Sequence, residues 1–368
     1  MIIKKFSATD FRNIKSCKLE LFPGINLLHG RNAQGKTNAL EGIYLFSRGK
    51  SFRAREDGDM KRFGTEGFHI AIEYEDSTGD ATLEYSYFGK DRVRKKNGYK
   101  LKSVSEMIGS FRSVLFYPDN LEIVKGGPEE RRSFINVAIS QCYPSYIKYY
   151  SDYKKALENR NCLLKLMGKG LFVSPDELES WSYSMADYAS YIYLMREEYL
   201  ARLTPKAVKI AGEISGGSEA LSITHECEID TGITSRSEVR DRYVALLNSA
   251  PDRERGAGVT LFGPHRDDIK LSINGNDSRL YASQGQQRSV VLALKLGEGE
   301  VIKELTGEYP VYLFDDVLSE LDEGRRKFVL SELSDRQMII TSCESEEYEK
   351  YGAKIIEVSE GEYVSAHR

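Results

Sequence analysis

GRNAQGKT, residues 30–37, decides the fold of this chain. The octapeptide fits the phosphate-loop pattern G-x-x-x-x-G-K-[ST], in which glycines turn backbone N–H groups toward a phosphate while the lysine and the hydroxyl bind its oxygens and Mg²⁺. An apolar run at 24–28 precedes it, and residues 38–46 carry apolar side chains at helical spacing. Both flanks favour a strand–loop–helix unit over a chance glycine-rich turn. We therefore predict that a nucleotide and Mg²⁺ are bound by Gly30, Arg31, Asn32, Ala33, Gln34, Gly35, Lys36 and Thr37.

A second motif lies at residues 310–316, PVYLFDD, an apolar run that ends on two carboxylates. This pattern is typical of a Walker B motif, a buried parallel strand that delivers acidic groups at its carboxyl end. We predict that Asp315 holds Mg²⁺ together with Thr37, and that Asp316 orients or deprotonates the attacking water. With Lys36 on the phosphates, these aspartates are the predicted catalytic residues. The alternative, a pair of aspartates that only caps the next helix, is disfavoured by the phosphate loop.

Two shorter motifs lie on either side of this strand. Residues 281–288, YASQGQQR, precede a long helical pattern and are similar to the signature of ABC-type ATPases, as a variant of L-S-G-G-Q. Because a helix N-terminus favours an anion, we predict that the signature binds the γ-phosphate of nucleotide held by a second subunit. Residues 319–322, SELD, match the D-loop, which crosses between the two sites. Local helix caps are the alternative for both motifs. The predicted residues are Ser283, Gly285, Gln286 and Asp322.

The long separation of the two Walker motifs predicts an inserted lobe. We expect an ATPase lobe at 1–125 and 300–368, and a helical lobe at 126–299 that includes the signature. Apolar and tyrosine positions recur every three or four residues over 146–166 and 174–214, which predicts an antiparallel helical hairpin. Ser174 is the expected N-cap of the second helix, with Glu177 completing a capping box. The predicted fold is α/β: an ABC-type P-loop ATPase head with an inserted, mainly α-helical second lobe that carries a short antiparallel helical arm.

Several blocks of sequence carry a family resemblance that covers most of the chain: residues 10–14, 24–41, 49–53, 118–126, 130–132 and 263–268. On these blocks the chain resembles the SMC-like ATPases of DNA repair, and within them the RecF family of recombination mediators. The resemblance implies an ATP- and Mg²⁺-dependent homodimer that closes on double-stranded DNA or on single-to-double-strand junctions at gaps. It implies RecR and RecO as partners, with RecA loading as the outcome. It also implies a weak, DNA-stimulated ATPase that works as a switch, and a nucleotide contact from Arg12.

Two other classes of protein share these motifs: the ATPase subunit of a transporter, and an SMC-like head that organises DNA structurally. A transporter subunit places its Walker motifs closer together, so the inserted lobe disfavours that class. A structural organiser has long arms, and the predicted helical arm is too short for that class. No apolar stretch approaches the roughly eighteen residues of a membrane helix, and we expect no membrane partner and a cytoplasmic, nucleoid-associated location. The cysteines are scattered without a C-x-x-C pair, which predicts free thiols at Cys17, Cys142, Cys162, Cys227 and Cys343.

The densest basic run, residues 90–102, is the predicted DNA contact in a chain whose net charge is -4. Asn97-Gly98 is a type I′ turn signal, so the run should form a hairpin, with Arg92, Arg94 and Lys96 on one face. We predict that this hairpin meets the phosphate backbone without reading base sequence. A solvated edge hairpin protected by lysines is an equally weighted alternative. The candidate contacts are Arg92, Arg94, Lys95, Lys96 and Lys100.

Two positions depart from the wider ABC pattern and predict slow hydrolysis. Cys343 follows the strand after Walker B, where many relatives carry a histidine that senses the γ-phosphate, and Asp316 stands where many use glutamate. A well-placed base is worth about 10²–10⁴-fold in rate, so a shorter side chain should give a long-lived ATP-bound dimer. For residues 263–268, GPHRDD, we favour a buried charged network that joins the two lobes over a direct contact with DNA or protein.

Overall fold

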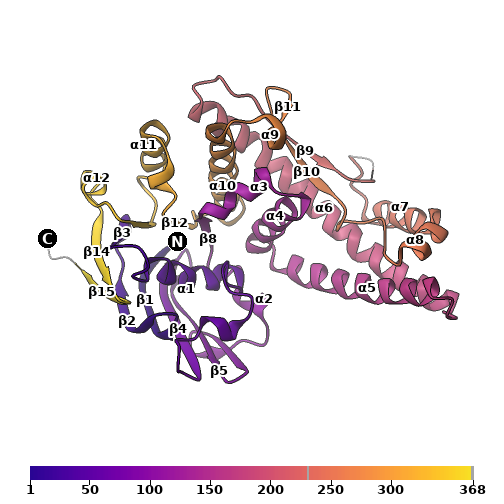
Figure 1. The fold of residues 1–368 in the computed structure, drawn as a ribbon, viewed down its shortest axis with the longest axis horizontal. Helices are drawn as coiled ribbons and strands as arrows, with labels where there is room; N and C mark the ends of the chain where they lie inside the picture. The colour runs from indigo at the N-terminus through magenta and orange to yellow at the C-terminus, as the bar shows by residue number, and fades with distance from the viewer. Residues whose placement is uncertain (230–231, 366–368) are drawn as a thin grey trace.

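A computed structural model describes residues 1–229 and 232–365 of the 368. Figure 1 shows the strands of one lobe at the left and a long helical arm that extends from the other lobe to the right. The helices of that second lobe come from the middle of the chain, while the sheets of the first lobe use both ends of it. This arrangement confirms the predicted α/β head with an inserted, mainly helical lobe.

The nucleotide-binding motifs follow strands of one six-stranded sheet with the order β15-β14-β3-β13-β12-β8. Its strands are parallel except for β15, which pairs antiparallel with β14. Strands β12 and β13 are buried along their whole length, as expected for a parallel sheet covered on both faces. Parallel strands end at the same edge, so the residues after β3, β12 and β13 converge. The bounds are β3 Ile25–His29, β8 Ser113–Phe116, β12 Val311–Asp315, β13 Met338–Ser342, β14 Lys354–Ser359 and β15 Glu362–Ser365.

A second, antiparallel sheet has the order β2-β1-β4-β5-β6-β7. Its inner face shares a hydrophobic core with helix α1 (Lys36–Arg48) and with one face of the parallel sheet. A Cβ on Gly42 of α1 would lie 2.8 Å from the ring of Phe6, so the helix can approach strand β1 this closely only at a glycine. The bounds are β1 Ile2–Phe11, β2 Ile14–Glu20, β4 Gly67–Asp76, β5 Gly79–Phe88, β6 Asp91–Lys96 and β7 Tyr99–Lys100.

The helical lobe is built around an antiparallel pair of helices that form the arm, α5 (Pro144–Gly168) and α6 (Pro175–Ile214). The bounds of both helices lie within two residues of the predicted ranges 146–166 and 174–214. Ser174 is the N-cap of α6 but its side chain accepts no capping hydrogen bond, so the predicted capping box with Glu177 is wrong. The lobe also contains a three-stranded sheet that was not predicted. The strands of this sheet and the other helices of the lobe are α3 Glu122–Lys125, α4 Pro128–Cys142, β9 Leu221–Glu226, α7 Arg236–Ser249, α8 Pro251–Ala257, β10 Asp268–Ile273 and β11 Asn276–Asp277.

The two lobes share a core instead of meeting at a linker. Helix α10 is continuous over Gln284–Thr306, so the expected boundary between residues 299 and 300 falls inside it. Buried residues of α10 belong to one hydrophobic cluster with Leu27 of the parallel sheet and Tyr193 of α6. The signature helix is therefore anchored in both lobes. The remaining short elements are η1 Asp57–Met60, α2 Val104–Met107, η2 Pro118–Leu121, α9 Ser278–Tyr281, η3 Leu318–Glu320, α11 Glu323–Glu332 and α12 Glu346–Glu349.

The segment 263–268 forms a buried charged network, as expected, but within the helical lobe and not between the lobes. Asp267 accepts a hydrogen bond from Nη1 of Arg196 at 3.0 Å, and its Oδ2 lies 3.3 Å from Nε2 of His225. Asp268 pairs with Arg131 through two bonds of 2.7 and 2.8 Å. Burial opposes a charged imidazole, yet hydrogen bonds to Asp267, Cys227 and Glu197 raise the pKa of His225 to about 11. The network thus fixes α4, α6, β9 and β10 to one another.

Candidate nucleotide site

The phosphate loop has the backbone that its sequence predicts. A Cβ on Gly30 would lie 2.2 Å from the carbonyl oxygen of Val358, and Gly35 has φ 112°, a conformation that side chains disfavour. Lys36 Nζ donates to the carbonyl oxygen of Gly30 at 2.5 Å and to that of Arg31 at 3.3 Å. The ammonium group therefore lies over its own loop, in the position from which a P-loop lysine binds phosphate oxygens.

Contacts from distant parts of the chain support the loop, and sequence reasoning missed them. The Tyr363 hydroxyl donates to the carbonyl oxygen of Gly35 at 2.8 Å, and the Gly361 amide donates to that of Gln34 at 2.9 Å. Asn13 Nδ2 donates to the same Gln34 oxygen at 3.1 Å. The β14–β15 hairpin and the β1–β2 turn thus hold the loop from outside. Asn13 falls inside a block that carried the family resemblance, whereas no local signal pointed to Tyr363.

The structure brings the predicted metal ligands together at the end of β12. Thr37 Oγ1 donates to Asp315 Oδ1 at 2.7 Å, so a hydroxyl and a carboxylate meet where Mg²⁺ would bind. Burial raises the pKa of Asp315, against hydrogen bonds from Thr37 and Thr341 that lower it. A cation would favour the charged carboxylate, so these oxygen ligands fit Mg²⁺. The described residues contain no cluster of three or more acidic, histidine or cysteine side chains that could hold a metal ion.

Asp316 is the first residue beyond β12 and has φ 55°, in the left-handed region. Its backbone N–H donates to Thr341 Oγ1 at 2.9 Å. Burial raises the pKa of its carboxyl, and the nearby Lys36 ammonium opposes that shift. Asp316 is thus a half-buried carboxylate close to the phosphate-loop lysine, which is where a group that activates water has to be.

The signature and the D-loop are helix caps in this monomer. Ser283 is the N-cap of α10: its Oγ accepts from the Gln286 amide at 3.2 Å, while Gln286 Oε1 accepts from the Ser283 amide at 2.9 Å. Asp322 is the N-cap of α11, with Oδ1 accepting from the Arg325 amide at 3.0 Å. These caps were the alternatives considered for both motifs. They leave Gly285 in the first turn of a long helix, where a phosphate from a partner could approach.

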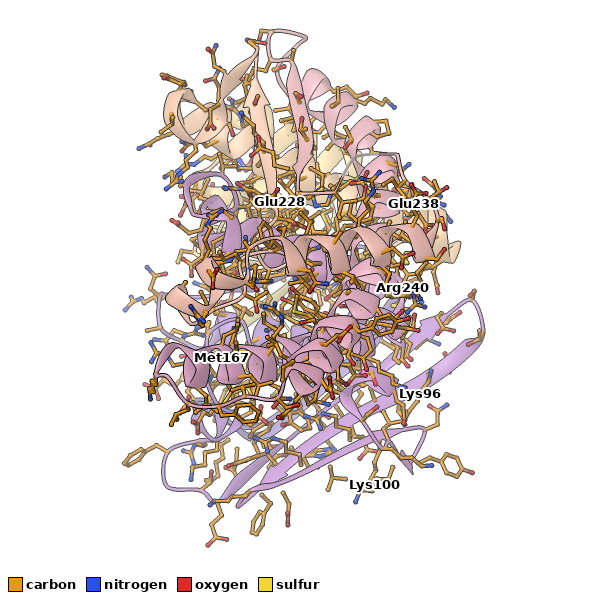
Figure 2. All side chains as sticks on the ribbon, turned by 90° about the vertical axis from the view of Figure 1, so that its right-hand side faces the viewer. Lys96, Lys100, Met167, Glu228, Glu238 and Arg240 are labelled. Atoms are coloured by element: carbon orange, nitrogen blue, oxygen red, sulfur yellow. The ribbon has the colours of Figure 1, made fainter. Side chains whose placement is uncertain are left out.

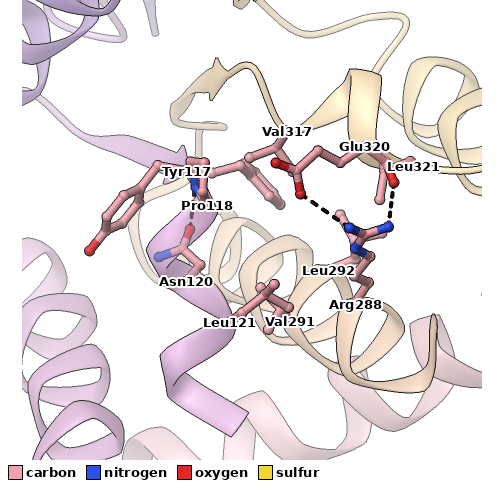
Figure 3. A pocket seen from close by; sticks show the side chains of 11 residues that line it. Tyr117, Pro118, Asn120, Leu121, Arg288, Val291, Leu292, Val317, Glu320 and Leu321 are labelled. Carbon is pink, nitrogen blue, oxygen red and sulfur yellow. Dashed lines mark hydrogen bonds and ion pairs between the residues drawn. The ribbon is translucent and has the colours of Figure 1, made fainter. Parts of the chain in front are cut away.

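Arg288 and Arg325 join the signature helix to the D-loop. Arg288 donates to the carbonyl oxygen of Glu320 at 2.6 Å and to its carboxylate at 3.3 Å. Figure 3 shows this pair at the mouth of a small apolar pocket lined by Val291, Leu321 and their neighbours. Arg325 Nε donates to Ser289 Oγ at 3.0 Å. Because side chains of both helices interlock, the signature and the D-loop are connected as one unit.

Arg12 is bonded to protein groups. Its guanidinium donates to Glu41 through two bonds of 2.9 and 2.6 Å, and to the carbonyl oxygen of Asp59 at 2.8 Å. Glu41 is fully buried in helix α1, so the arginine ties the β1–β2 turn to the helix that follows the phosphate loop. Its contact with nucleotide stays a prediction.

The basic hairpin forms as predicted, with Asn97 and Gly98 both at positive φ. Its arginines, however, have partners within the protein, although the Arg92 side chain is 49% exposed. Arg92 pairs with Asp57, and the Arg94 guanidinium lies 4.6 Å from the centre of the Tyr85 ring. Lys96 donates to Ser110 Oγ at 3.1 Å. Lys95 points the other way, with its Nζ 3.9 Å from a carboxylate oxygen of Glu84, and its cross-strand neighbour Lys100 is exposed. Their contact with DNA stays a prediction.

Cys343 lies beside the phosphate loop, at the position where many ABC ATPases are expected to carry a histidine. Its Sγ is 3.1 Å from Lys36 Nζ and 3.1 Å from Asn32 Oδ1. All five cysteines are free, as predicted, and Cys343 and Cys162 are both exposed. We expect MgATP to slow alkylation of Cys343 by iodoacetamide at least about tenfold, because thiol reactivity depends on access and bound phosphate would cover it. Peptide mass spectrometry measures this, with Cys162 on the arm as the internal control. Equal protection of both thiols, or of neither, would contradict the placement.

No helix within residues 1–229 and 232–365 is long and apolar enough to span a membrane. The chain matches the RecF/RecN/SMC N-terminal domain family over residues 2–365. The DNA replication and repair protein RecF of Acetivibrio thermocellus is 38% identical over 352 residues, which cover 95% of each chain. A solved structure of the recombination mediator protein RecF with ATP, in the RecFOR pathway, has a TM-score of 0.92 and 36% identity, covering 100% of this chain and 98% of that one.

A Smc head domain from Pyrococcus furiosus shares the fold, with a TM-score of 0.57 at 16% identity over 99% of this chain and 96% of that one. Identity at the level of the RecF proteins, sustained over nearly the whole length of both chains, goes beyond a shared fold. The chain belongs to the RecF family of DNA replication and repair proteins.

Proposed function

We propose that the chain is an ATP-driven DNA clamp of recombinational repair. Two protomers would hold two ATP molecules, each between residues 30–37 of one protomer and residues 283–286 of the other. The observation that supports this most strongly is that the two halves of the site are built separately. Ser283 and Asp322 cap their own helices, while the Walker residues bond to one another. The N-terminus of α10 would be offered to a nucleotide held by residues 30–37 of a second copy.

Exposed side chains next to the signature support pairing through this face. Leu280 and Tyr281 are 71% and 73% exposed, immediately before the signature cap. Aromatic side chains are enriched at interfaces between proteins, and large exposed apolar residues next to a binding motif suit a surface that becomes covered. The helix dipole of α10, a helix of 23 residues, would favour the γ-phosphate of the partner's nucleotide.

Hydrolysis is proposed to be slow, stimulated by DNA, and to act as the release step of a switch. Asp316 is one methylene shorter than the glutamate of many ABC ATPases, and Cys343 replaces the usual sensor histidine. Thr37 and Asp315 would hold Mg²⁺, which supplies charge neutralisation for the phosphates when bound. The chain's own residues bind the phosphates, hold the metal ligands in place and accept a proton from water at Asp316.

The proposed DNA surface lies between the arm and the antiparallel sheet. A groove of about 550 Å³ opens between the end of α1 and helices α4 and α5. Its lining includes the cations Arg48, Arg132 and Lys154 against the carboxylate of Glu129. Burial lowers the pKa of Arg132, with the charge of Arg196 adding to the effect, so a neighbouring phosphate would stabilise this cation. The surplus of positive charge suits the phosphate backbone.

The hairpin extends this basic surface. Figure 1 shows the antiparallel sheet at the lower left and the arm at the right, and Figure 2, which looks at the arm from its end, labels Lys96 and Lys100 on strands below the arm helices. The arm helices of 25 and 40 residues are short for a protein that tethers distant DNA segments, which disfavours a purely structural organiser. The RecFOR pathway of the solved RecF relative supports RecR and RecO as partners. Single-strand gaps and strand junctions as targets, with RecA loading as the outcome, are proposed from the resemblance seen in the sequence.

Charge reversal tests the DNA surface. We expect Lys95→Glu, Lys100→Glu and Lys154→Glu, combined, to lower the slope of log Kd against log salt concentration by about one per lost phosphate contact, because each contact releases a counterion. Fluorescence anisotropy on gapped and blunt duplex DNA, with a non-hydrolysable ATP analogue, measures the slope. Lys209→Glu is the matched control, since Lys209 is 76% exposed and lies on α6, which carries none of the three lysines. An unchanged slope in the triple variant would exclude this surface.

A further inference from the structure

Thr341 occupies a position that no motif assigned. It lies on β13, directly opposite Asp315 in the parallel register of β12 and β13. Its side chain is fully buried. The hydroxyl has one proton and two lone pairs, and both capacities are used at the Walker B strand. Oγ1 donates to Asp315 Oδ1 at 3.0 Å and accepts from the Asp316 backbone N–H at 2.9 Å.

The first bond fixes the metal-binding carboxylate. Asp315 Oδ1 accepts from two hydroxyls, Thr37 at 2.7 Å and Thr341 at 3.0 Å. The two donors come from helix α1 and strand β13, so the carboxylate is held from two sides and its rotation is restricted. A carboxylate that was free to rotate would present either oxygen to a cation, with a less defined geometry.

The second bond fixes the direction of the catalytic aspartate. Asp316 has φ 55°, in a region that residues with side chains rarely adopt, although aspartate tolerates it better than most. Two hydrogen bonds hold this conformation: the Asp316 N–H donates to Thr341 Oγ1, and Ser319 Oγ donates to the Asp316 carbonyl oxygen at 2.6 Å. Loss of the bond to Thr341 would release the backbone at Asp316 and move its carboxyl away from the water.

We propose that Thr341 is a positioning residue for ATP hydrolysis, whose single hydroxyl aligns Asp315 with the metal and Asp316 with the water. The inference rests on the proposed ATPase function. A folding role alone does not require the hydroxyl: β13 is apolar at its neighbours Ile339 and Ile340, and valine has the same shape and suits a buried strand.

The test compares Thr341→Val with Thr341→Ser. We expect Thr341→Val to lower kcat by about 10²-fold, the effect of misplacing a catalytic group by roughly 1 Å, with KM for ATP within about twofold of the wild type. Thr341→Ser keeps the hydroxyl and should restore most of the rate. A second readout does not depend on turnover. Mg²⁺ should increase the affinity for a fluorescent ATP analogue, relative to EDTA, and this increase should be several-fold smaller in Thr341→Val than in the wild type.

Ser113→Ala is the matched control. Ser113 is a fully buried hydroxyl on β8 of the same sheet, and its Oγ bonds to that of Ser47 at 2.7 Å, away from both aspartates. Its kcat and Mg²⁺ response should stay at the wild-type level. If Thr341→Val fails to fold by circular dichroism, Thr341→Ala carries the same expectations. Wild-type kcat and Mg²⁺ response in Thr341→Val, or an equal loss in Ser113→Ala, would overturn the proposal. A wild-type chain without any ATPase activity would overturn the proposed function itself.

Discussion

Replacing Asp316 with asparagine is expected to lower ATP turnover by about 10²–10⁴-fold while leaving ATP binding intact. The amide has the shape of the carboxyl but cannot take a proton from water. The backbone of residue 316 would keep its bond to Thr341, so the loop geometry should survive. Dimers formed with MgATP should then persist, because the step that releases them is blocked. Phosphate release gives the rate, and sedimentation velocity after removal of free nucleotide gives the lifetime of the dimer.

The control for this variant is Asp335→Asn, an aspartate on the surface whose side chain is 74% exposed. It should hydrolyse ATP like the wild type. Burial raises the pKa of Asp316, so wild-type turnover should fall with decreasing pH at a higher pH than an ordinary aspartate would give, because the base acts only when ionised. Asp316→Asn with wild-type turnover would remove this carboxyl from the mechanism.

Replacing Lys36 with alanine is expected to weaken ATP binding at least about 100-fold and to prevent dimerisation. Lys36 is 4% exposed, and its ammonium lies over the phosphate loop. Hydrogen bonds to charged groups contribute about 1.5–3 kcal/mol each, so losing two contacts to phosphate oxygens accounts for a change of this size. Titration with a fluorescent ATP analogue measures the affinity.

Lys18→Ala is the control, an exposed lysine on strand β2. It should bind ATP normally and form dimers. If Lys36→Ala bound ATP with near wild-type affinity, the loop at 30–37 would not be the nucleotide site, and the assignment of both halves of the site would fail with it.

The geometry of the phosphate loop and of the Walker B strand was predictable because their signals are local. The spacing of Gly30, Gly35 and Lys36 specifies a loop, and an apolar strand that ends on two acids specifies where the metal ligands lie. The register that places Thr37 beside Asp315 then follows from the rule that parallel strands end at one edge. The arm was predictable for a similar reason, since its helical periodicity runs over many turns.

Other features depend on contacts that no local pattern encodes. Tyr363 contacts the phosphate loop although more than 300 residues separate them in the sequence. The contacts of Thr341 with the two aspartates depend on the pairing of β13 with β12. The sheet of β9, β10 and β11 was missed because its strands are short and β9 alternates without a strong apolar face. The lobe boundary was misplaced because α10 has no break in composition where it passes between lobes.

The distribution of basic residues along the sequence predicted the basic surface of the protein poorly. The basic run at 90–102 predicted a hairpin correctly, but sequence could not tell which face would turn inward. Arg92 forms an ion pair with Asp57, which lies far away in the sequence, and Arg94 packs on the ring of Tyr85. The groove that gathers Arg48, Arg132 and Lys154 draws its cations from separate helices and left no run to detect.

In the proposed clamp, ATP occupancy is converted into pairing of two protomers. The most direct measurement is the mass of the purified chain by sedimentation velocity, with MgATP, with MgADP and without nucleotide, over a range of protein concentrations. We expect a species of twice the chain mass with MgATP and the monomer with MgADP or no nucleotide. A chain that binds MgATP and stays monomeric at every concentration, with and without gapped duplex DNA, would contradict it.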